Sequence, residues 1–394
     1  MYQQFFDSAI KQLKQENRYR NFINISRLCS EFPYAINNHN QQKVIVWCSN
    51  DYLGMGQNQT SISLAQKALQ KYGLGAGGTR NISGNNQAIV ELEQAVANLH
   101  CKEKAIICSS GYITNDTTIQ ALNQIIPNLI IFSDSKNHAS IIAGIKNSKA
   151  KKHIFTHNNL SELAEQLKLY PKNQPKLIIF ESVYSMDGDF GDIAGIVDLA
   201  KKYQALTYID EVHAVGIYGQ AAGLSKQLNL HNQIDFIQGT FGKAFGVFGG
   251  YITGNQIAID AIRSYASGFI FSTALPPVLA VAIKQNILHL QNSNQEREIL
   301  FKNVAYLKHQ LQKTNIKIFD NQSHIVSVLV GDAYKAEQIS TNLLKQHNIY
   351  VQHINYPTVA KNDERLRITA TSLHNFTMID DLVYALQNTI TEVL

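Results

Sequence analysis

The sequence predicts an α/β protein with a large domain on a mostly parallel, seven-stranded sheet and a smaller α+β domain at its C-terminal end. Three observations favour this fold. Short apolar runs alternate with helical periods over about 200 residues. The 394 residues are enough for one large domain and a second, smaller one. The composition changes at the polar run NSNQE of residues 292–296. Strand–helix alternation of this kind is typical of a parallel sheet covered by helices on both faces.

The elements follow from these patterns in chain order. Residues 5–16 are expected to form a helix, followed by an irregular arm around residues 18–20. Apolar runs then predict seven strands, at residues 105–108, 129–133, 152–156, 176–181, 206–210, 236–238 and 249–253. Helical periods predict helices at residues 62–72, 88–99, 160–169 and 196–203.

A long helix is expected across the composition break at residues 292–296. Beyond it, a compact α+β unit is predicted from strand-like segments at 325–330, 349–353 and 366–370 and helical ones at 336–344 and 378–393. The predicted division is therefore an N-terminal helix and arm at residues 1–45, a large domain at 46–290 and a small domain at 291–394.

Composition and charge argue against several classes of protein. The net charge of +5 comes from scattered basic residues, whereas nucleic-acid binders usually concentrate such charge on one face. The net positive charge is equally compatible with an acidic small molecule, such as an acyl thioester that carries phosphates. The N-terminus lacks the apolar core of a secretory signal. The apolar stretch at residues 269–290 is broken by Pro276 and Pro277, so no membrane span is expected.

The cysteines also carry information about compartment and metal binding. The four residues Cys29, Cys48, Cys101 and Cys108 form no CxxC pair, so we expect no metal site. Free thiols are typical of a reducing compartment, which here predicts the cytoplasm.

Lys243 is the most informative single residue. It lies in GTFGKAFG at residues 239–246, which holds three glycines in eight residues. A helix rarely contains so many, because each costs about 1 kcal/mol relative to alanine. The segment is therefore a loop that permits close backbone approach, and its lysine is a candidate Schiff-base amine. The alternative is a surface lysine on a glycine-rich turn.

Asp210 ends the apolar run at residues 206–209. A carboxylate at a buried strand end is costly unless it is paired, and a protonated pyridine nitrogen is a suitable partner. A helix N-cap is the alternative interpretation. His213 follows three residues later, and could hydrogen-bond a phenolic oxygen or be an ordinary loop histidine.

Other polar residues also follow predicted strands. Gly111 and Tyr112 stand at an expected helix start, where free N–H groups bind phosphate; a plain N-cap is the alternative. His138 could stack on a cofactor ring or be structural, and Ser185 is placed to donate to a cofactor or substrate oxygen. These residues together match the needs of pyridoxal phosphate (PLP), which requires an acid for its ring nitrogen, a site for its phosphate and an amine nucleophile.

The glycine-rich run at residues 73–80 contains a formal GxGxxG pattern. A dinucleotide site needs a strand before this pattern and a helix after it. Here a predicted helix precedes it, so a flexible loop that shapes a substrate pocket is favoured. A nucleotide-dependent oxidoreductase remains the rival function from another class.

Taken together, these motifs resemble the α-oxoamine synthases, fold-type I PLP enzymes that condense an amino acid with an acyl-CoA. The matching segments cover nearly the whole chain, at residues 46–56, 75–84, 137–140, 181–188, 210–216, 239–246, 267–277 and 356–359. The resemblance points to the members that join glycine to succinyl-CoA and yield 5-aminolevulinate, a tetrapyrrole precursor. Members that use acetyl-CoA or a pimeloyl thioester are the alternatives.

The resemblance also implies roles for individual residues. Lys243 would bind PLP covalently and then act as acid–base catalyst, with Asp210 on the ring nitrogen, His213 on the phenolic oxygen and His138 stacked on the ring. Further cofactor contacts would come from Gly111, Tyr112, Ser185 and Thr240, and from Ser272 and Thr273 of the other subunit of a homodimer.

Substrate contacts are implied in the same way. Arg367 would bind the glycine carboxylate with help from Asn50. The acyl-CoA would be contacted by Arg20, Thr79, Asn81, Ser133, Lys152 and Thr358. Of these, Arg20, Thr79 and Asn81 can supply the cationic and polar donors that a succinyl carboxylate needs and an acetyl group does not.

Overall fold

The computed structural model describes residues 2–393, and its contacts divide the chain into two compact units. Unit 1 comprises the residues up to Gly54, the short segment Met186–Gly188 and the residues from Gln295 onward. Unit 2 comprises Met55–Ser185 and Asp189–Asn294. The three-part division expected from the sequence stays a prediction.

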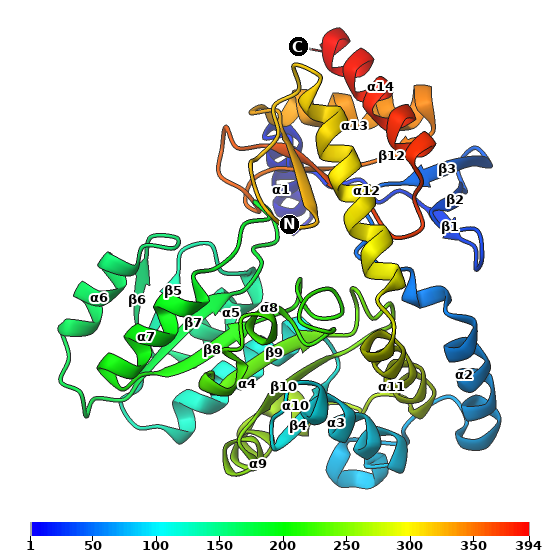
Figure 1. Ribbon diagram of the computed structural model, residues 1–394. Coiled ribbons are helices and arrows are strands. Elements are labelled where there is room, and N and C mark those ends of the chain that lie inside the picture. Colours follow the sequence, from blue (N-terminus) through cyan, green and yellow to red (C-terminus); the bar gives the residue numbers. More distant parts are fainter. Residues whose placement is uncertain (1, 394) are drawn as a thin grey trace. The chain divides into compact units, whose positions relative to one another are not determined.

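Unit 2 is built on one seven-stranded sheet (Figure 1). Its strands lie in the order β4 (Lys104–Cys108), β10 (Gly250–Gly254), β9 (Phe236–Thr240), β8 (Leu206–Asp210), β7 (Lys176–Glu181), β5 (Ile130–Asp134) and β6 (Lys151–Phe155). Strand β10 runs antiparallel to β4 and β9, and the remaining neighbours pair in parallel. The predicted mostly parallel sheet of seven strands is confirmed.

Helices cover this sheet because its strands are apolar on both faces. In β7 every residue is buried, and Ile178, Ile179 and Phe180 have no exposed surface. Strands of this kind need helices on both sides. The helices of unit 2 are α2 (Gln59–Tyr72), α3 (Gln87–Leu99), α4 (Gly111–Ile125), α5 (Ala139–Ser148), α6 (Leu160–Lys168), α7 (Ile193–Tyr203), α8 (Leu224–Gln227), α9 (Gln256–Tyr265), α10 (Ser267–Ile270) and α11 (Pro277–Asn292).

Unit 1 contains two smaller sheets. The first has the order β1 (Ile25–Arg27), β2 (Tyr34–Asn37), β3 (Gln42–Val46) and β12 (Ile349–Tyr350), with β3 and β12 parallel. The second is antiparallel, with the order β11 (Ile325–Leu329), β14 (Arg365–Thr369) and β13 (Gln352–Ile354). The helices of this unit are α1 (Gln3–Gln15), α12 (Gln295–Gln312), α13 (Ala333–His347) and α14 (Phe376–Val393).

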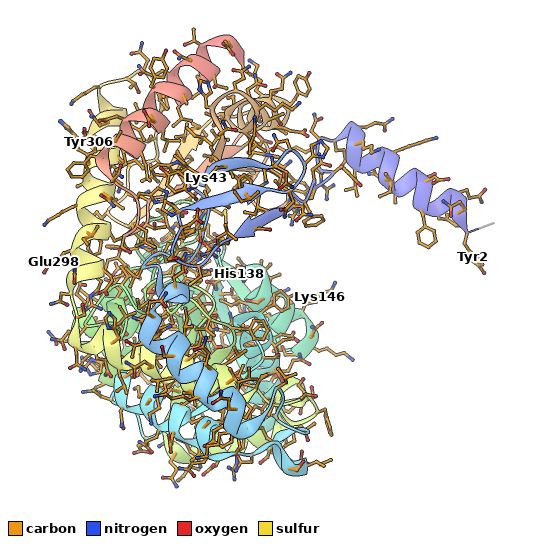
Figure 2. All side chains as sticks on the ribbon, turned by 90° about the vertical axis from the view of Figure 1, so that its right-hand side faces the viewer. Tyr2, Lys43, His138, Lys146, Glu298 and Tyr306 are labelled. Atoms are coloured by element: carbon orange, nitrogen blue, oxygen red, sulfur yellow. The ribbon has the colours of Figure 1, made fainter. Side chains whose placement is uncertain are left out.

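Helix α1 has no buried residue, and the aromatic side chains Tyr2, Phe5 and Phe6 at its start are exposed. In Figure 2 it extends away from the two sheets of its own unit.

Two expectations about elements are wrong. The long helix across residues 292–296 is two helices, because Ser293 has extended dihedral angles and α12 starts afresh at Gln295. The strand expected at 349–353 is two short strands separated by Val351. The arm around residues 18–20 is irregular, as expected. Strands β1, β2 and β3, which follow it, were not predicted, because their polar residues hide the strand pattern. Within residues 2–393, no helix is long and apolar enough to cross a lipid bilayer.

Candidate active site

The carboxyl ends of the strands in unit 2 carry most of the predicted cofactor-binding residues. The predicted residues Asp210 and Thr240 end β8 and β9, and Gly111 opens α4 just after β4. Two further acidic residues, Asp134 and Glu181, end β5 and β7. Parallel strands end at one edge of a sheet, which is where ligands bind in such folds. The topology therefore gathers the predicted site at one edge.

Lys243 and His213 meet there. The Lys243 Nζ atom lies 2.6 Å from Nε2 of His213. The lysine loop is anchored by Phe241 and Phe245, which have no exposed surface. A Cβ at Gly246, where φ is +69°, would come 2.1 Å from the backbone nitrogen of Gly56. The glycine is therefore required, and the loop that carries Lys243 has little freedom to move.

Asp210 is 4% exposed and accepts hydrogen bonds from neutral donors. Its carboxylate accepts from the Asn115 side-chain amide at 2.8 Å and from the Val212 backbone N–H at 2.9 Å. Asn115 in turn accepts from the Tyr208 hydroxyl at 2.7 Å, and burial raises the pKa of Tyr208 well above its usual range. A buried carboxylate that these two neutral donors hold in place fits a cationic ring N–H.

Asn115 was not predicted from the sequence. It lies four residues after Gly111 in α4, so one helical turn places both on the same face. That spacing was the available signal in the sequence.

His138 is the N-cap of α5, and its Nδ1 accepts from the Ser140 backbone N–H at 3.2 Å. Its own backbone N–H donates to the Glu181 carboxylate at 2.5 Å. The residue keeps some exposed surface. Burial of the rest lowers the pKa of His138, Lys243 lowers it further, and Asp210 opposes this. A neutral ring with an accessible face is suited to stacking on a flat cofactor.

The helix start at Gly111 can hold a phosphate group. The first N–H groups of a helix have no partners within it. A Cβ on Gly111 would come 3.3 Å from Cβ of Thr240, so the two residues are in close contact. The Thr240 hydroxyl accepts from the Gly242 backbone N–H at 3.2 Å and donates to the Gly249 carbonyl at 2.8 Å. Tyr112 is 47% exposed beside this site.

Two more predicted segments of unit 2 lie side by side. Thr79 and Thr273 form an antiparallel bridge, and the Ala274 backbone N–H donates to the Gly78 carbonyl at 3.0 Å. The Thr79 hydroxyl donates to the Asn81 side chain at 2.7 Å. The predicted acyl-CoA contacts Thr79 and Asn81 thus adjoin the segment of Ser272 and Thr273.

Unit 1 brings together the residues expected to bind the glycine carboxylate. Arg367 is 7% exposed and donates to Oδ1 of Asn50 and to the Tyr52 hydroxyl, each at 3.1 Å. Tyr52 also donates to Asn50 at 3.1 Å, and its role was not predicted. Elsewhere in this unit, Arg20 donates to the Thr358 hydroxyl at 3.5 Å.

The remaining predicted residues lie in unit 2. Ser133 is only 1% exposed, and its hydroxyl accepts from the Asn137 side chain at 2.9 Å, so it offers little surface to a substrate. Lys152 is exposed on β6, and Ser185 is half-buried in the loop after β7.

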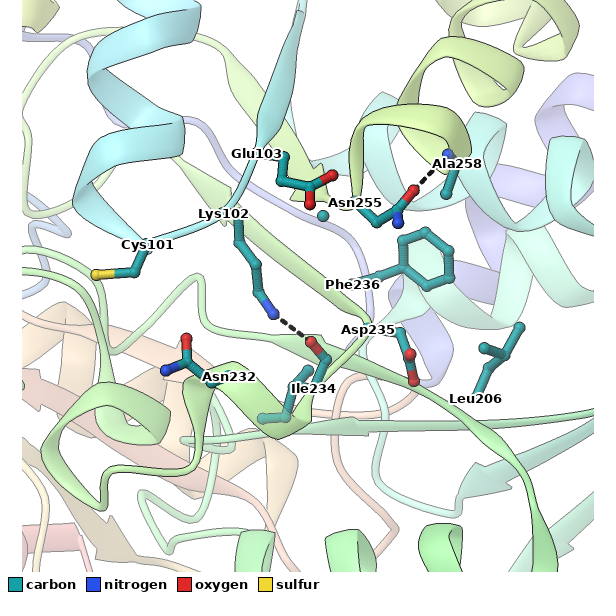
Figure 3. A pocket seen from close by; sticks show the side chains of 11 residues that line it. Cys101, Lys102, Glu103, Leu206, Asn232, Ile234, Asp235, Phe236, Asn255 and Ala258 are labelled. Carbon is teal, nitrogen blue, oxygen red and sulfur yellow. Dashed lines mark hydrogen bonds between the residues drawn. The ribbon is translucent and has the colours of Figure 1, made fainter.

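A cavity of about 570 Å³ lies at the opposite edge of the sheet (Figure 3). It is lined by Leu206, Phe236 and Gly254, at the ends of β8, β9 and β10. Its Lys102 donates to the Ile234 carbonyl at 2.5 Å. None of the predicted site residues lines this cavity. No cluster of three or more His, Cys, Asp or Glu residues able to hold a metal occurs in the described chain.

Comparison with known proteins identifies the family of the chain. The family of class I and II aminotransferases matches residues 42–386. The 5-aminolevulinate synthase of Rickettsia bellii is 50% identical over 386 residues, which cover 98% of this chain and 93% of that one. The enzyme of the same name from Bradyrhizobium diazoefficiens is 47% identical over 388 residues, covering 98% and 95%.

The chain belongs to the 5-aminolevulinate synthase family. Among solved structures, a serine palmitoyltransferase from S. paucimobilis with a bound PLP–myriocin aldimine superposes with a TM-score of 0.91. It is 27% identical and covers 100% of this chain and 99% of its own. The 8-amino-7-oxononanoate synthase of Francisella tularensis, at 22% identity, a TM-score of 0.75 and coverage of 89% and 98%, shares the fold.

Membership in the 5-aminolevulinate synthase family confirms the predicted fold class and the predicted enzyme class. The GxGxxG run follows helix α2, and no strand precedes it directly. It therefore lacks the structural context of a dinucleotide-binding site.

Proposed function

We propose that this protein condenses glycine with succinyl-CoA to give 5-aminolevulinate, coenzyme A and carbon dioxide, as a PLP-dependent homodimer in the cytoplasm. The observation that carries this proposal is the full-length similarity, at 47–50% identity, to curated 5-aminolevulinate synthases. The local geometry of the site supports it.

The residues present fit PLP. Lys243 would bind it covalently, Asp210 would hold the ring nitrogen, and the helix start at Gly111 with Thr240 would hold the phosphate. His213 and His138 would contact the phenolic oxygen and the ring face. When bound, PLP supplies a cationic ring that takes up the electron pair released when a bond to the glycine Cα breaks.

Lys243 is the proton-transfer group of this reaction. The amino group of glycine would first replace Lys243 on the cofactor, and the freed lysine amine would then take a proton from the glycine Cα. That carbon then bonds to the thioester carbonyl carbon, the C–S bond breaks, and the thiolate leaving group is protonated to coenzyme A. After the carboxylate has left as carbon dioxide, Lys243 returns a proton to the same carbon. His213, 2.6 Å from Nζ, fixes where the amine points.

Arg367 would bind the carboxylate of glycine. A guanidinium forms two parallel hydrogen bonds with a carboxylate, and Asn50 and Tyr52 hold this one in place at 3.1 Å. Arg20, Thr79 and Asn81 are the donors expected at the succinyl carboxylate, and Lys152 and Thr358 complete the proposed acyl-CoA contacts. Ser133 is left out of this proposal because it is only 1% exposed.

The homodimer is supported by exposed apolar side chains. Phe271, directly before Ser272 and Thr273, is 80% exposed, and Leu74 and Ile82 in the neighbouring loop are 81% and 67% exposed. Apolar surface of this kind is typical of an interface. Ser272 and Thr273 would contact the partner's cofactor phosphate, whereas Tyr112 and Ser185 would contact the cofactor of their own subunit.

A spectrum and a thioester panel test the function. The purified protein should be yellow with bound PLP, and with glycine it should use succinyl-CoA at a higher kcat/KM than acetyl-CoA. A colourless protein that does not bind added PLP would refute the cofactor assignment. Equal use of the two thioesters would instead favour a member of the wider family that accepts acetyl-CoA.

A further inference from the structure

His157, two residues beyond β6, bridges two carboxylates. Its Nδ1 lies 3.0 Å and 3.1 Å from the two oxygens of Asp134, and its Nε2 lies 2.6 Å from Oδ2 of Asp189. The Asp134 side chain is fully buried, and those of His157 and Asp189 are 12% and 33% exposed. Because both ring nitrogens face carboxylates, both must donate, which only the protonated ring can do.

The environment favours that protonated form. Burial by itself lowers the pKa of His157, but the hydrogen bonds and charges of Asp134 and Asp189 outweigh it and raise the pKa to about 9. Tyr184 meets the ring edge-on, with the ring centroids 4.3 Å apart, and burial raises its own pKa. The Asn158 amide lies 3.3 Å from Nε2.

Asp134 connects His157 to the turn that leads to His138. It ends β5, and its Oδ1 accepts from the Lys136 backbone N–H at 2.8 Å. Its Oδ2 accepts from the Asn158 backbone N–H at 3.1 Å. The Asp134 carboxylate thus organises the turn at residues 134–138 and the residues after β6 at the same time.

Asp189 connects His157 to the loop that carries Ser185. Val183 and Phe190 form an antiparallel bridge, and the Tyr184 backbone N–H donates to the Asp189 carbonyl at 3.0 Å. Residues 183–190 therefore form a closed loop with Asp189 at its base.

Asn158 strengthens the same connection. Its φ of +55° is a conformation that asparagine tolerates better than most residues. Its side chain donates to the Phe190 carbonyl at 2.9 Å and accepts from the Asp192 backbone N–H at 3.0 Å. His157 and Asn158 thus hold the end of this loop, at residues 189–192.

We propose that His157 is a positioning residue: as a cation between Asp134 and Asp189, it fixes the loop of Ser185 to the end of β5 and sets the places of Ser185 and His138 for cofactor binding. The part that concerns the cofactor rests on the proposed function. The fixing of the two loops does not.

The test compares the holoenzyme with its His157→Gln variant. Amide hydrogen exchange should become faster at residues 135–138 and 184–190. PLP release from the holoenzyme should become about tenfold faster, the order expected for losing a charge-assisted hydrogen bond. His157→Arg, which keeps a cation, should restore part of both effects. His153→Gln is the matched control, since His153 lies in β6 and bonds the Tyr170 hydroxyl at 2.7 Å; it should leave both quantities unchanged.

Asp189→Asn is a second variant that keeps the buried Asp134–His157 pair. In this protein the faster exchange should be confined to residues 184–190. If His157→Gln lowers only the unfolding temperature, with exchange in both segments and PLP release as in the unaltered protein, the proposal is overturned. An unaltered protein that binds no PLP would refute the proposed function and the cofactor part, while the exchange comparison would still decide whether His157 fixes the loops.

Discussion

The amine of Lys243 and the imidazole of His213 lie 2.6 Å apart, at the ends of two neighbouring strands, β9 and β8. The two side chains come from residues 30 positions apart in the sequence, and the parallel pairing of their strands brings them together. Lys243 thus contacts a residue that lies three positions after Asp210, the last residue of β8.

Replacing Lys243 by alanine should leave the fold intact, because the loop is anchored by Phe241 and Phe245. The variant should lose the absorbance of covalently bound PLP, and its kcat should fall by about 10²–10⁴-fold or more, the contribution of a positioned acid–base group. Lys201→Ala, a change at an exposed lysine of α7, is the control. Retention of the band and of most activity would reject the assignment.

Asn115 should matter for catalysis although it need not touch the substrate. Asn115→Ala removes a donor at 2.8 Å from the buried Asp210 carboxylate, and a hydrogen bond to a charged group is worth about 1.5–3 kcal/mol. We expect kcat to fall by about tenfold or more, with a smaller change in the KM for glycine. Steady-state kinetics check this; an unchanged kcat would show that Asp210 needs no such support.

Arg367→Lys should raise the KM for glycine more than the KM for succinyl-CoA. A lysine keeps the charge but cannot form the planar, bidentate contact of a guanidinium. The same variant should lose the hydrogen bonds to Asn50 and Tyr52. Equal increases in both KM values would place Arg367 outside the glycine site.

The contribution of His157 to stability should depend on pH. Its pKa in the folded protein is raised to about 9 from a usual value of 6.5. A group with a raised folded pKa stabilises fully below its unfolded pKa, and this stabilisation is lost as pH rises through the folded value. The difference in denaturation midpoint between the unaltered protein and His157→Gln should therefore be largest near pH 6 and shrink by pH 10. A constant difference would contradict the charged bridge.

Mixed dimers can test whether sites are shared. One subunit carries Lys243→Ala and the other Ser272→Ala with Thr273→Ala. If each site uses both chains, one site of the mixed dimer contains all the changes and the other contains none. Activity per heterodimer should then approach half that of the unaltered protein. Activity no higher than the average of the two parents would mean that each site is built within one chain.

The sequence predicted best those elements whose own residues form a clear pattern. Strand β7 was predicted to the residue because it is buried on both faces and reads as a continuous apolar run. Strands β1, β2 and β3 were missed because they are short and partly exposed, and because β3 pairs with β12, which is distant in the sequence. The residues of β3 themselves give no indication of a pairing partner so far along the chain.

The same distinction applies to the site. Lys243 and Asp210 stand in short motifs with an unusual composition, so a role could be predicted for each. Asn115 and His157 form hydrogen bonds to residues on other elements or loops. In the sequence alone, neither can be told from an ordinary polar residue, because its hydrogen-bond partner is distant in the chain.

The parallel pairing of β3 with β12 has a consequence for how the protein is made. Ile45 pairs with Ile349, so one edge of the N-terminal sheet has no neighbour until almost the whole chain has been synthesised. At about 5–20 residues per second, the roughly 300 intervening residues take about 15–60 s to translate. During that interval β3 presents an open strand edge, which is a template for pairing with other chains. Chains released before residue 350 would keep that edge open permanently, and a nascent chain would need it shielded until translation is nearly complete.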